Sequence, residues 1–255
     1  MSGIGTGYDV TPTTYSPEGR IFQVEYAARS VENSSTAIGI RVSDGVIFGV
    51  EKKIISKMLV KGSNRRVGSV GDHIGASIAG LTADGRRIIK QANSEAKSYK
   101  DLTSEAIPLN VLVDRISSFV QMHTLYASIR PFGCAVMFGS YNEKDGAQLF
   151  LVEPSGVSFG YYGCAIGKAK QSAKTEIEKL NLSELTCREA IKQVAKIIYT
   201  IHDESKDKEM ELEMSWICKE SGGKHELVPD DLIAEAEQFA KDNTVSTNIL
   251  NFDNI

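Results

Sequence analysis

The fold of this 255-residue chain is decided near its start, by the stretch Tyr15-Ser-Pro-Glu-Gly-Arg-Ile-Phe-Gln-Val-Glu-Tyr-Ala27. Its first part, Ser16-Pro-Glu-Gly19, predicts a turn, because proline fixes its own φ and glycine accepts a positive φ. Apolar residues then recur at spacings of three and four (Ile21, Val24, Ala28 and Val31), which predicts a helix over about 19–32. So short a helix is marginal alone in water, so we expect it to dock on the rest of the fold.

The composition indicates a globular protein with a substantial core. Hydrophobic residues make up 42% of the chain and charged residues 24%, which are ordinary values. The formal net charge of −4 implies no basic face, so neither nucleic acid nor a membrane surface is an expected partner. No apolar run is long enough to span a membrane, and the start of the chain lacks the basic and apolar regions of a signal peptide.

Cysteine and histidine spacing predicts neither a disulfide framework nor a metal centre. The four cysteines are widely spaced and form no C-x-x-C pair, so we expect free thiols: Cys134, Cys164, Cys187 and Cys218. The four histidines show no ligand spacing with one another: His73, His123, His202 and His225. His202 ends a predicted helix, where an imidazole complements the helix dipole. We therefore expect no metal and no cofactor.

The predicted strands and helices come in runs rather than in alternation. Strands are predicted over 36–42, 46–50, 66–70, 74–79, 133–139, 147–152, 156–161, 211–218 and 224–228. Helices are predicted over 82–99, from Pro108 onward, over 168–180, over 184–201 and from Pro229 to about 241. Strands in hairpin runs and helices in pairs exclude a βαβ fold and favour an α+β sandwich of two antiparallel sheets with helix pairs outside.

Composition divides the chain into one domain and two tails. Residues 1–14 are rich in glycine, threonine and serine, which predicts a mobile tail. Residues 243–255 show no periodicity and are predicted to be a loose tail. A single domain is expected over 15–242.

One candidate nucleophile lies in Gly156-Val-Ser158-Phe-Gly160, which matches G-x-S-x-G. A nucleophile elbow needs a strand, a sharp turn at the serine and then a helix. Here the turn precedes Ser158 and strand residues follow it, so we expect Ser158 to be a strand residue without catalytic function.

Thr36 is the second candidate, because it heads a predicted central strand that turns back at Asp44-Gly45. Some hydrolases use an N-terminal threonine as nucleophile, with its free α-amine as base. The carboxylate of such an enzyme would fall on Glu51, and its lysine near Arg66, whose guanidinium does not deprotonate. A hydrolase that exposes Thr36 after processing, a stand-alone binding module and a non-catalytic subunit of a larger particle all stay open at this point.

A family resemblance favours the last of these. The pattern Tyr8-x4-Thr13-x-Tyr15-Ser-Pro-x-Gly-Arg20-x2-Gln23-Val-Glu-Tyr-Ala27 resembles the signature of the α-type subunits of the 20S proteasome. Further matches cover about 5–240: Thr36-Ala-Ile-Gly-Ile40, Gly45-Val46, Ile78-Ala-Gly-Leu81 followed by Asp84, Arg130-Pro-Phe-Gly133, Pro154-Ser-Gly156 and Ala165-Ile-Gly167. Within the family, one paralogue is favoured by Gly3-Ile-Gly-Thr-Gly-Tyr-Asp9, Val31-Glu-Asn-Ser-Ser35, Phe132-Gly-Cys134 and Lys174-Thr-Glu-Ile-Glu-Lys179.

The resemblance implies a four-layer αββα sandwich of the N-terminal nucleophile hydrolase type, without catalytic activity. It implies a place in a heptameric ring between neighbouring α subunits, stacked on a ring of β subunits. There the chain would help control substrate entry and dock the C-terminal tails of a regulatory particle or activator, in ubiquitin-dependent and ubiquitin-independent protein degradation. The expected compartments are cytoplasm and nucleus.

The resemblance also assigns two sets of site residues. The gate and turn cluster would consist of Tyr8, Asp9, Pro17 and Tyr26. The pocket for activator tails would include Gly19, Arg66, Gly80 and Leu81. The chain departs from the family pattern in three places: Arg66 replaces the usual lysine, Val10 replaces a basic residue that many relatives carry, and the tail after Asn243 is not the acidic run of this paralogue.

Overall fold

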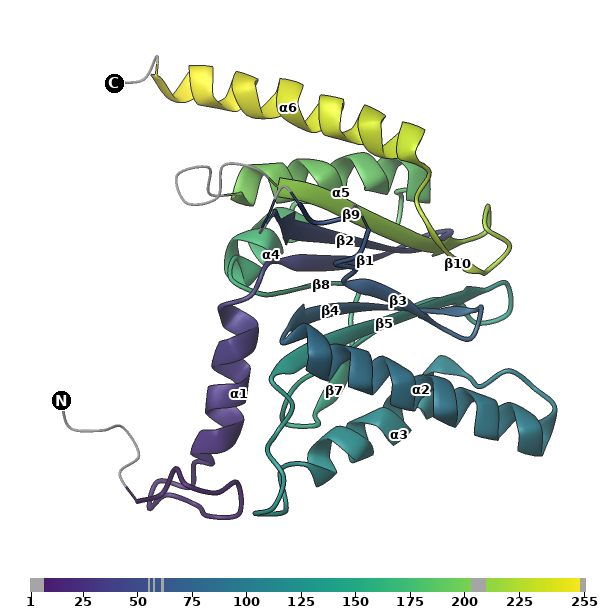
Figure 1. Ribbon diagram of the computed structural model, residues 1–255. Helices are drawn as coiled ribbons and strands as arrows, with labels where there is room; N and C mark the ends of the chain where they lie inside the picture. The colour runs from purple at the N-terminus through teal and green to yellow at the C-terminus, as the bar shows by residue number, and fades with distance from the viewer. Residues whose placement is uncertain (1–6, 55, 57, 61, 203–209, 253–255) are drawn as a thin grey trace.

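The chain is described from a computed structural model, over residues 7–54, 56, 58–60, 62–202 and 210–252, with side chains described as far as 243. Two antiparallel five-stranded sheets pack face to face, and helices cover the outer face of each (Figure 1). The strand order is β10-β9-β2-β1-β8 in the first sheet and β3-β4-β5-β6-β7 in the second. The predicted αββα sandwich is confirmed.

The helices are α1 (Phe22–Glu32), α2 (Thr82–Thr103), α3 (Leu109–Met122), α4 (Lys170–Glu178), α5 (Cys187–Ile201) and α6 (Asp230–Phe252). The strands are β1 (Ala37–Val42), β2 (Gly45–Lys53), β3 (Val67–Val70), β4 (Ile74–Gly80), β5 (Cys134–Asn142), β6 (Gly146–Val152), β7 (Ser158–Gly160), β8 (Gly163–Ile166), β9 (Met210–Cys218) and β10 (His225–Leu227).

Three apolar layers hold the sandwich together. Helices α2 and α3 pack on the second sheet, and α4, α5 and α6 lie over the first (Figure 1). Between the sheets, fully buried side chains such as Phe48 and Met137 fill the space. Strand β2 is buried from Gly45 to Lys52, as its continuous apolar run predicts. Because the central strands are covered on both faces, a site is expected at an end of the sandwich rather than within its middle layers.

Helix α1 occupies one such end. It stands beside the sheets, close to the ends of β4 and β5 (Figure 1). It begins at Phe22, later than predicted, because Ser16 and Arg20 are joined by hydrogen bonds of the preceding turn. The expected docking of this short helix on the fold is confirmed by the burial of Phe22 and Val31.

Two other elements differ from the sequence prediction. Strand β8 was not predicted, because its four residues are too few for a periodic pattern, and its partner β1 is distant in sequence. Helix α6 runs to Phe252, past the predicted end near 241 and into the segment predicted to be loose. No glycine or proline interrupts α6, although Thr244, Val245 and Ser246 are weak helix formers.

Candidate functional site

The segment before α1 folds back on itself in a tight turn. The Gly19 N–H donates to the Ser16 carbonyl at 2.9 Å, and the Ser16 N–H donates to the Arg20 carbonyl at 2.9 Å. Gly19 has a φ of 77°, in the left-handed region that glycine tolerates best. The predicted turn is therefore confirmed. On its far side, Arg20 donates to the Glu25 carboxylate, with Nε to Oε1 at 2.7 Å.

The structure brings together part of the expected gate cluster. The Tyr26 hydroxyl donates to the Asp9 carboxylate at 3.3 Å, and the Gln23 side-chain amide donates to the Asp9 carbonyl. Burial, followed by the Asp9 charge, raises the pKa of Tyr26. Tyr8 and Pro17 are exposed. Gln23 was named in the sequence only as part of the family signature, and its contact with Asp9 could not be read from spacing.

Three of the four expected pocket residues also lie together. The Arg66 guanidinium donates through Nη1 to the Gly80 carbonyl at 3.2 Å, and Leu81 follows with 48% of its surface exposed. Burial lowers the pKa of Arg66, and the nearby Glu213 carboxylate partly opposes that effect. A guanidinium nevertheless stays protonated, and its bond to the Gly80 carbonyl holds the positive charge of Arg66 at the start of α2.

Gly19 lies apart from these three. It precedes α1, whereas Gly80 is bonded to Ser34, just beyond the other end of that helix. The 11 residues of α1 span about 16 Å. One chain therefore does not bring Gly19 to Arg66.

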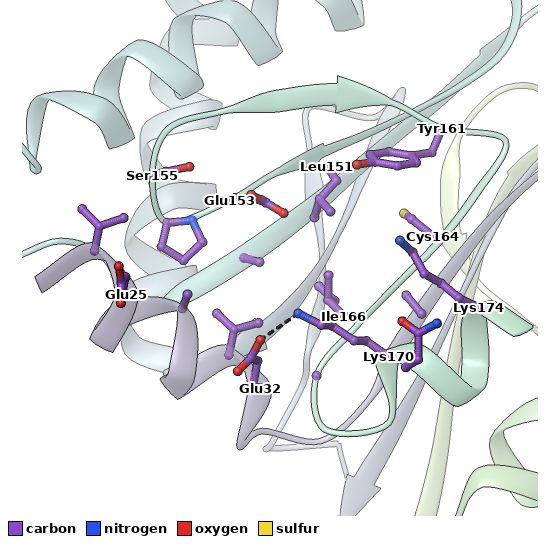
Figure 2. Close-up of a pocket in the computed structure, with 18 residues that line it drawn as sticks. Glu25, Glu32, Leu151, Glu153, Ser155, Tyr161, Cys164, Ile166, Lys170 and Lys174 are labelled. Atoms are coloured by element: carbon purple, nitrogen blue, oxygen red, sulfur yellow. Dashed lines mark hydrogen bonds and ion pairs between the residues drawn. The ribbon is translucent and has the colours of Figure 1, made fainter. Parts of the chain in front are cut away.

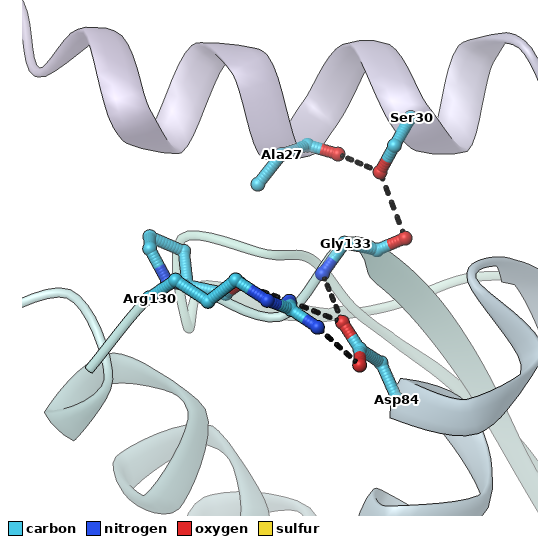
Figure 3. Close-up of polar contacts among 6 residues, drawn as sticks. Ala27, Ser30, Asp84, Arg130 and Gly133 are labelled. Carbon is cyan, nitrogen blue, oxygen red and sulfur yellow. Dashed lines mark hydrogen bonds and ion pairs between the residues drawn. The ribbon is translucent and has the colours of Figure 1, made fainter. Parts of the chain in front are cut away.

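A network of hydrogen bonds joins α1 to the start of α2 through Gly133 (Figure 3). The Gly133 carbonyl accepts from the Ser30 hydroxyl at 2.8 Å and from the Leu81 N–H at 2.9 Å. The Gly133 N–H donates to Asp84 at 2.9 Å. Gly80, at the end of β4, is also bonded to the segment that follows α1, because its N–H donates to the Ser34 hydroxyl at 2.8 Å.

Asp84 connects this network to Arg130, whose side chain is exposed at the protein surface. Arg130 donates to both of its carboxylate oxygens, at 2.6 Å and 2.8 Å, in the two-pronged geometry that favours arginine (Figure 3). These bonds from Arg130 hold the pKa of Asp84 below its ordinary value, against the effect of burial, and the Gly133 N–H adds to them. Ile78-Ala-Gly-Leu81, Asp84 and Arg130-Pro-Phe-Gly133 are thus one constellation, which the sequence marked only as separate family matches.

Thr36 is covered. Its exposed fraction is 1%, its hydroxyl accepts from the Ala169 N–H at 3.2 Å, and its own N–H faces a Glu51 carboxylate oxygen at 3.4 Å. The other Glu51 oxygen lies 2.8 Å from His202 Nδ1. Glu51 falls beside Thr36 as the sequence predicted, but it is engaged with a histidine at the end of α5. A nucleophile needs an open face. A cavity of about 220 Å³ borders Thr36, Glu51 and Lys53, but only 1% of Thr36 itself is exposed and its hydroxyl is already hydrogen-bonded.

The remaining candidates carry no site. Ser158 begins β7, which leads into β8 rather than into a helix, so the prediction of a strand residue is confirmed. Among the described residues, no group of three or more histidine, cysteine or acidic side chains is placed to hold a metal ion. No helix in the described part of the chain is long and apolar enough to cross a membrane.

A cavity of about 350 Å³ separates α1 from β8 and α4 (Figure 2). Its floor is apolar, with Cys164 and Ile166, and the ion pair of Glu32 with Lys170, at 2.8 Å, crosses its rim. Glu25 and Glu153 also line the cavity (Figure 2). Acidic and basic side chains are mixed there, so the cavity offers no strong preference for an anion or a cation.

Comparison with known proteins agrees with this geometry. A model of the family described as proteasome subunit matches residues 31–217, and a model of the N-terminal signature of A-type proteasome subunits matches residues 8–29. The chain belongs to the α-type subunits of the 20S proteasome. The signature spans the turn and most of α1, so the stretch that distinguishes α-type subunits is also the one that covers the end of the sandwich.

Relatives of this α-type chain are similar over nearly its whole length. The chain is 58% identical to the proteasome alpha type-3 subunit of Arabidopsis thaliana, over 94% of this chain and 96% of that protein. It is 59% identical to the alpha type-3 subunit of Spinacia oleracea, with the same coverage. A probable alpha type-7 subunit of Saccharomyces cerevisiae is 49% identical over 94% of this chain and 85% of that protein. The paralogue that the sequence segments favoured is alpha type-3, systematically α7, in agreement with these names.

Proposed function

We propose that the chain is a non-catalytic structural and gating subunit of the α ring of the 20S core particle. In this role it stands between neighbouring α subunits of a heptameric ring, above the β subunits, in cytoplasm and nucleus. It serves ubiquitin-dependent and ubiquitin-independent degradation by controlling substrate entry. The observation that carries the proposal is the position of α1 at the end of the sandwich, with the buried Thr36 just beyond it.

The lack of catalysis is supported by the surroundings of Thr36. Its hydroxyl is already hydrogen-bonded to the backbone of Ala169, and Glu51 is paired with His202. The position expected for a lysine is held by Arg66, whose guanidinium stays protonated. A processed enzyme would need the removal of α1, and the apolar surface that Phe22 and Val31 now cover would then be exposed.

The test of this first part uses the particle purified with the chain. We expect a native mass of hundreds of kilodaltons, an intact mass of this subunit that includes residues before Thr36, and no labelling of it by a threonine-directed electrophile. The catalytic subunits of the same particle provide the positive control for the label. Labelling of Thr36, or an active monomer on a native gel, would contradict the proposal.

Docking of activator tails is supported by the grouping of Arg66, Gly80 and the half-exposed Leu81. A terminal carboxylate would meet the guanidinium, whose Nη1 is already oriented by the Gly80 carbonyl. Because charge-assisted hydrogen bonds contribute about 1.5–3 kcal/mol, Arg66→Gln should weaken binding of a synthetic activator-tail peptide at least about tenfold. Arg188→Gln, which removes an exposed arginine on α5, is the matched control. Equal binding by both variants would show that Arg66 takes no part.

Gating is supported by the contacts of Asp9 with Tyr26 and Gln23, which tie the segment before the turn to α1. Deletion of residues 1–7 in the assembled particle should raise hydrolysis of small fluorogenic peptides in the absence of activator. An unchanged basal rate would mean that the N-terminal tail of this chain does not obstruct entry.

A further inference from the structure

Two of the four cysteines lie together, at the end of the first sheet that is remote from α1 (Figure 1). Cys187 is the first residue of α5, and Cys218 is the last residue of β9. The turn between β1 and β2 brings them together, because the Asp44 carboxylate accepts from the Cys187 N–H at 2.8 Å and Gly45 pairs with Cys218. The thiol of Cys187 donates a hydrogen bond to the sulfur of Cys218.

The Cys218 sulfur accepts hydrogen bonds from more than one donor. Besides the Cys187 thiol, the Ser221 N–H donates to it at 3.4 Å. The bond from Cys187 lowers the pKa of Cys218 to about 6, against the effect of burial, and the N–H groups of Ser221 and Glu220 add to it. The same bond, followed by burial and the Asp44 charge, raises the pKa of Cys187. At neutral pH one sulfur is therefore a thiolate, and its neighbour keeps its proton.

The other two cysteines differ from this pair. Cys134 and Cys164 are buried among apolar side chains, and the Cys164 thiol lies 3.2 Å from the Met137 sulfur. Burial raises the pKa of both thiols to about 12. A buried cysteine commonly acts as a small apolar residue, which accounts for Cys134 and Cys164. It does not account for the donors around the Cys218 sulfur.

The pair lies next to an exposed turn. Cys218 leads directly into Lys219 and Glu220, which are exposed. Arg188, the neighbour of Cys187 in sequence, donates through Nε to the Glu220 carboxylate at 2.9 Å. Surface ion pairs of this kind contribute little to stability. Local opening of the turn therefore admits a small molecule to the two thiols, although both are covered in this structure.

We propose that Cys187 and Cys218 are a redox-active pair that hydrogen peroxide converts into a disulfide. The Cys218 thiolate attacks one peroxide oxygen, so that an S–O bond forms, the O–O bond breaks and hydroxide leaves. The Cys187 thiol then attacks the Cys218 sulfur. An S–S bond forms, the S–O bond breaks, and the oxygen leaves with the thiol proton as water. Two electrons pass from the two sulfur atoms to the peroxide.

The disulfide joins the start of α5 to the end of β9. It anchors the turn over 219–224 at Cys218, so hydrogen exchange in that turn should become slower after oxidation. Thr36 precedes β1, whereas Asp44 follows it, so oxidation acts at the opposite end of that strand. The inference is independent of the proposed docking and gating, because neither cysteine belongs to their residues.

The experiment treats the assembled core particle with hydrogen peroxide at neutral pH, denatures it, alkylates the remaining thiols with N-ethylmaleimide and maps them by mass spectrometry. We expect Cys187 and Cys218 to lose alkylation together, and a linked pair of peptides two hydrogens lighter than the reduced peptides. The loss should be at least about tenfold faster than at Cys134 and Cys164, because the thiolate is the reactive form. Dithiothreitol should restore alkylation of the pair.

Serine variants separate the two steps. Cys218→Ser removes the attacking thiolate, so Cys187 should stay reduced. Cys187→Ser removes the second thiol, so Cys218 should stop at the sulfenic acid, which a dimedone probe labels. Cys164→Ser is the matched control at a buried cysteine, and it should form the disulfide at the wild-type rate. The wild-type result stands even where a variant does not assemble, because Cys134 and Cys164 are controls within the same chain.

Three results would overturn the proposal. The first is equal reactivity of all four cysteines, or none, toward peroxide. The second is oxidation of Cys218 that dithiothreitol does not reverse while Cys187 is still alkylated, since the two thiols would then not act as a pair. The third is a disulfide that leaves hydrogen exchange over 219–224 unchanged, because the bond would then not restrain the turn.

Discussion

The two ends of helix α1 are held in different ways. At its C-terminal end, Ser30, Glu32 and Ser34 bond to three separate parts of the fold, before β5, in α4 and at the end of β4. At its N-terminal end, the side chains of Arg20, Gln23 and Tyr26 bond to Glu25 and Asp9, within the same N-terminal segment. The first end is bonded to the body of the protein, and the second mainly to its own neighbours in sequence.

The difference indicates which end can move. The Ser30 and Ser34 bonds lie between closely packed backbones and are not replaced by water without cost. Bonds at the N-terminal end are partly exposed, and Arg20 with Glu25 is a surface pair, a type that contributes little to stability. We therefore expect the C-terminal end of α1 to be held more firmly than its N-terminal end. The following substitutions test this difference.

The largest effect is expected for Gly80→Ala. Gly80 has a φ of 108°, and a Cβ would lie 2.3 Å from the Gly133 carbonyl. Positive φ and a backbone clash together should lower the free energy of unfolding by about 3–5 kcal/mol. Urea unfolding of the full chain measures the loss.

Gly19→Ala is the matched substitution at the other end. Gly19 also has a positive φ, 77°, but a Cβ there would meet nothing within 4 Å. Only the cost of the left-handed conformation remains, about 1 kcal/mol. Equal losses in the free energy of unfolding for Gly80→Ala and Gly19→Ala would show that the two ends of α1 are equally constrained, which contradicts the difference described above.

Asp84→Ala is expected to have the second largest effect, about 2–3 kcal/mol at pH 7, because it removes both Arg130 bonds and the acceptor of the Gly133 N–H. Glu95→Ala, which removes the exposed pair with Arg115, should cost at most about 0.5 kcal/mol. Urea unfolding of both variants beside the wild type gives the comparison.

The same variant has a pH signature. The folded pKa of Asp84 is lower than its unfolded value of about 4. Its stabilising contribution is therefore complete above the unfolded pKa and is lost as the pH falls through the folded pKa. The stability gap between wild type and Asp84→Ala should narrow below about pH 4, and a gap that widens on acidification would contradict this assignment.

Ser34→Ala should cost about 1–2 kcal/mol, since it leaves the Gly80 N–H without its acceptor. The loss is measured by urea unfolding, with Ser118→Ala as a serine whose bond to Asp114 stays within one helix. A loss no larger than that of Ser118→Ala would mean that water replaces the Ser34 hydroxyl at this end of α1.

Tyr26→Phe should have the smallest effect on stability, below about 0.5 kcal/mol, because the lost bond to Asp9 is long, at 3.3 Å, and only partly buried. Its effect should be visible instead as faster hydrogen exchange over residues 8–20, with exchange over 79–85 unchanged. Faster exchange at both places would mean that the two ends of α1 are not independent.

Much of the fold could be predicted from the sequence. Apolar periodicity and turn residues such as Asp44-Gly45 predicted the strand runs, the helix pairs and hence the αββα layers. Thr36 was correctly placed just ahead of a central strand, beside Glu51. These features depend on patterns that extend over a few consecutive residues, and such patterns are visible in a single sequence.

The network of hydrogen bonds around Gly133 could not be predicted in the same way. Ser30 and Gly133 are 103 positions apart, and Asp84 meets Gly133 across 49. A serine hydroxyl inside a helix commonly bonds to a carbonyl one turn earlier in the same helix. Only the fold reveals that the Ser30 hydroxyl also lies within hydrogen-bond distance of the Gly133 carbonyl. The start of α1 was missed for a related reason, because hydrogen bonds within the turn at Ser16, rather than apolar spacing, decide where the helix begins.

The position of α1 also sets an order for biosynthesis. The helix precedes in the chain the groups that hold it, since its bond to Gly133 spans 103 positions and its ion pair with Lys170 spans 138. An isolated helix of 11 residues is marginal in water, so α1 must wait, largely unfolded, until both sheets have formed. A segment made early is thus among the last to fold, and a nascent chain exposes the flank of its sandwich until the strands of both sheets have been made.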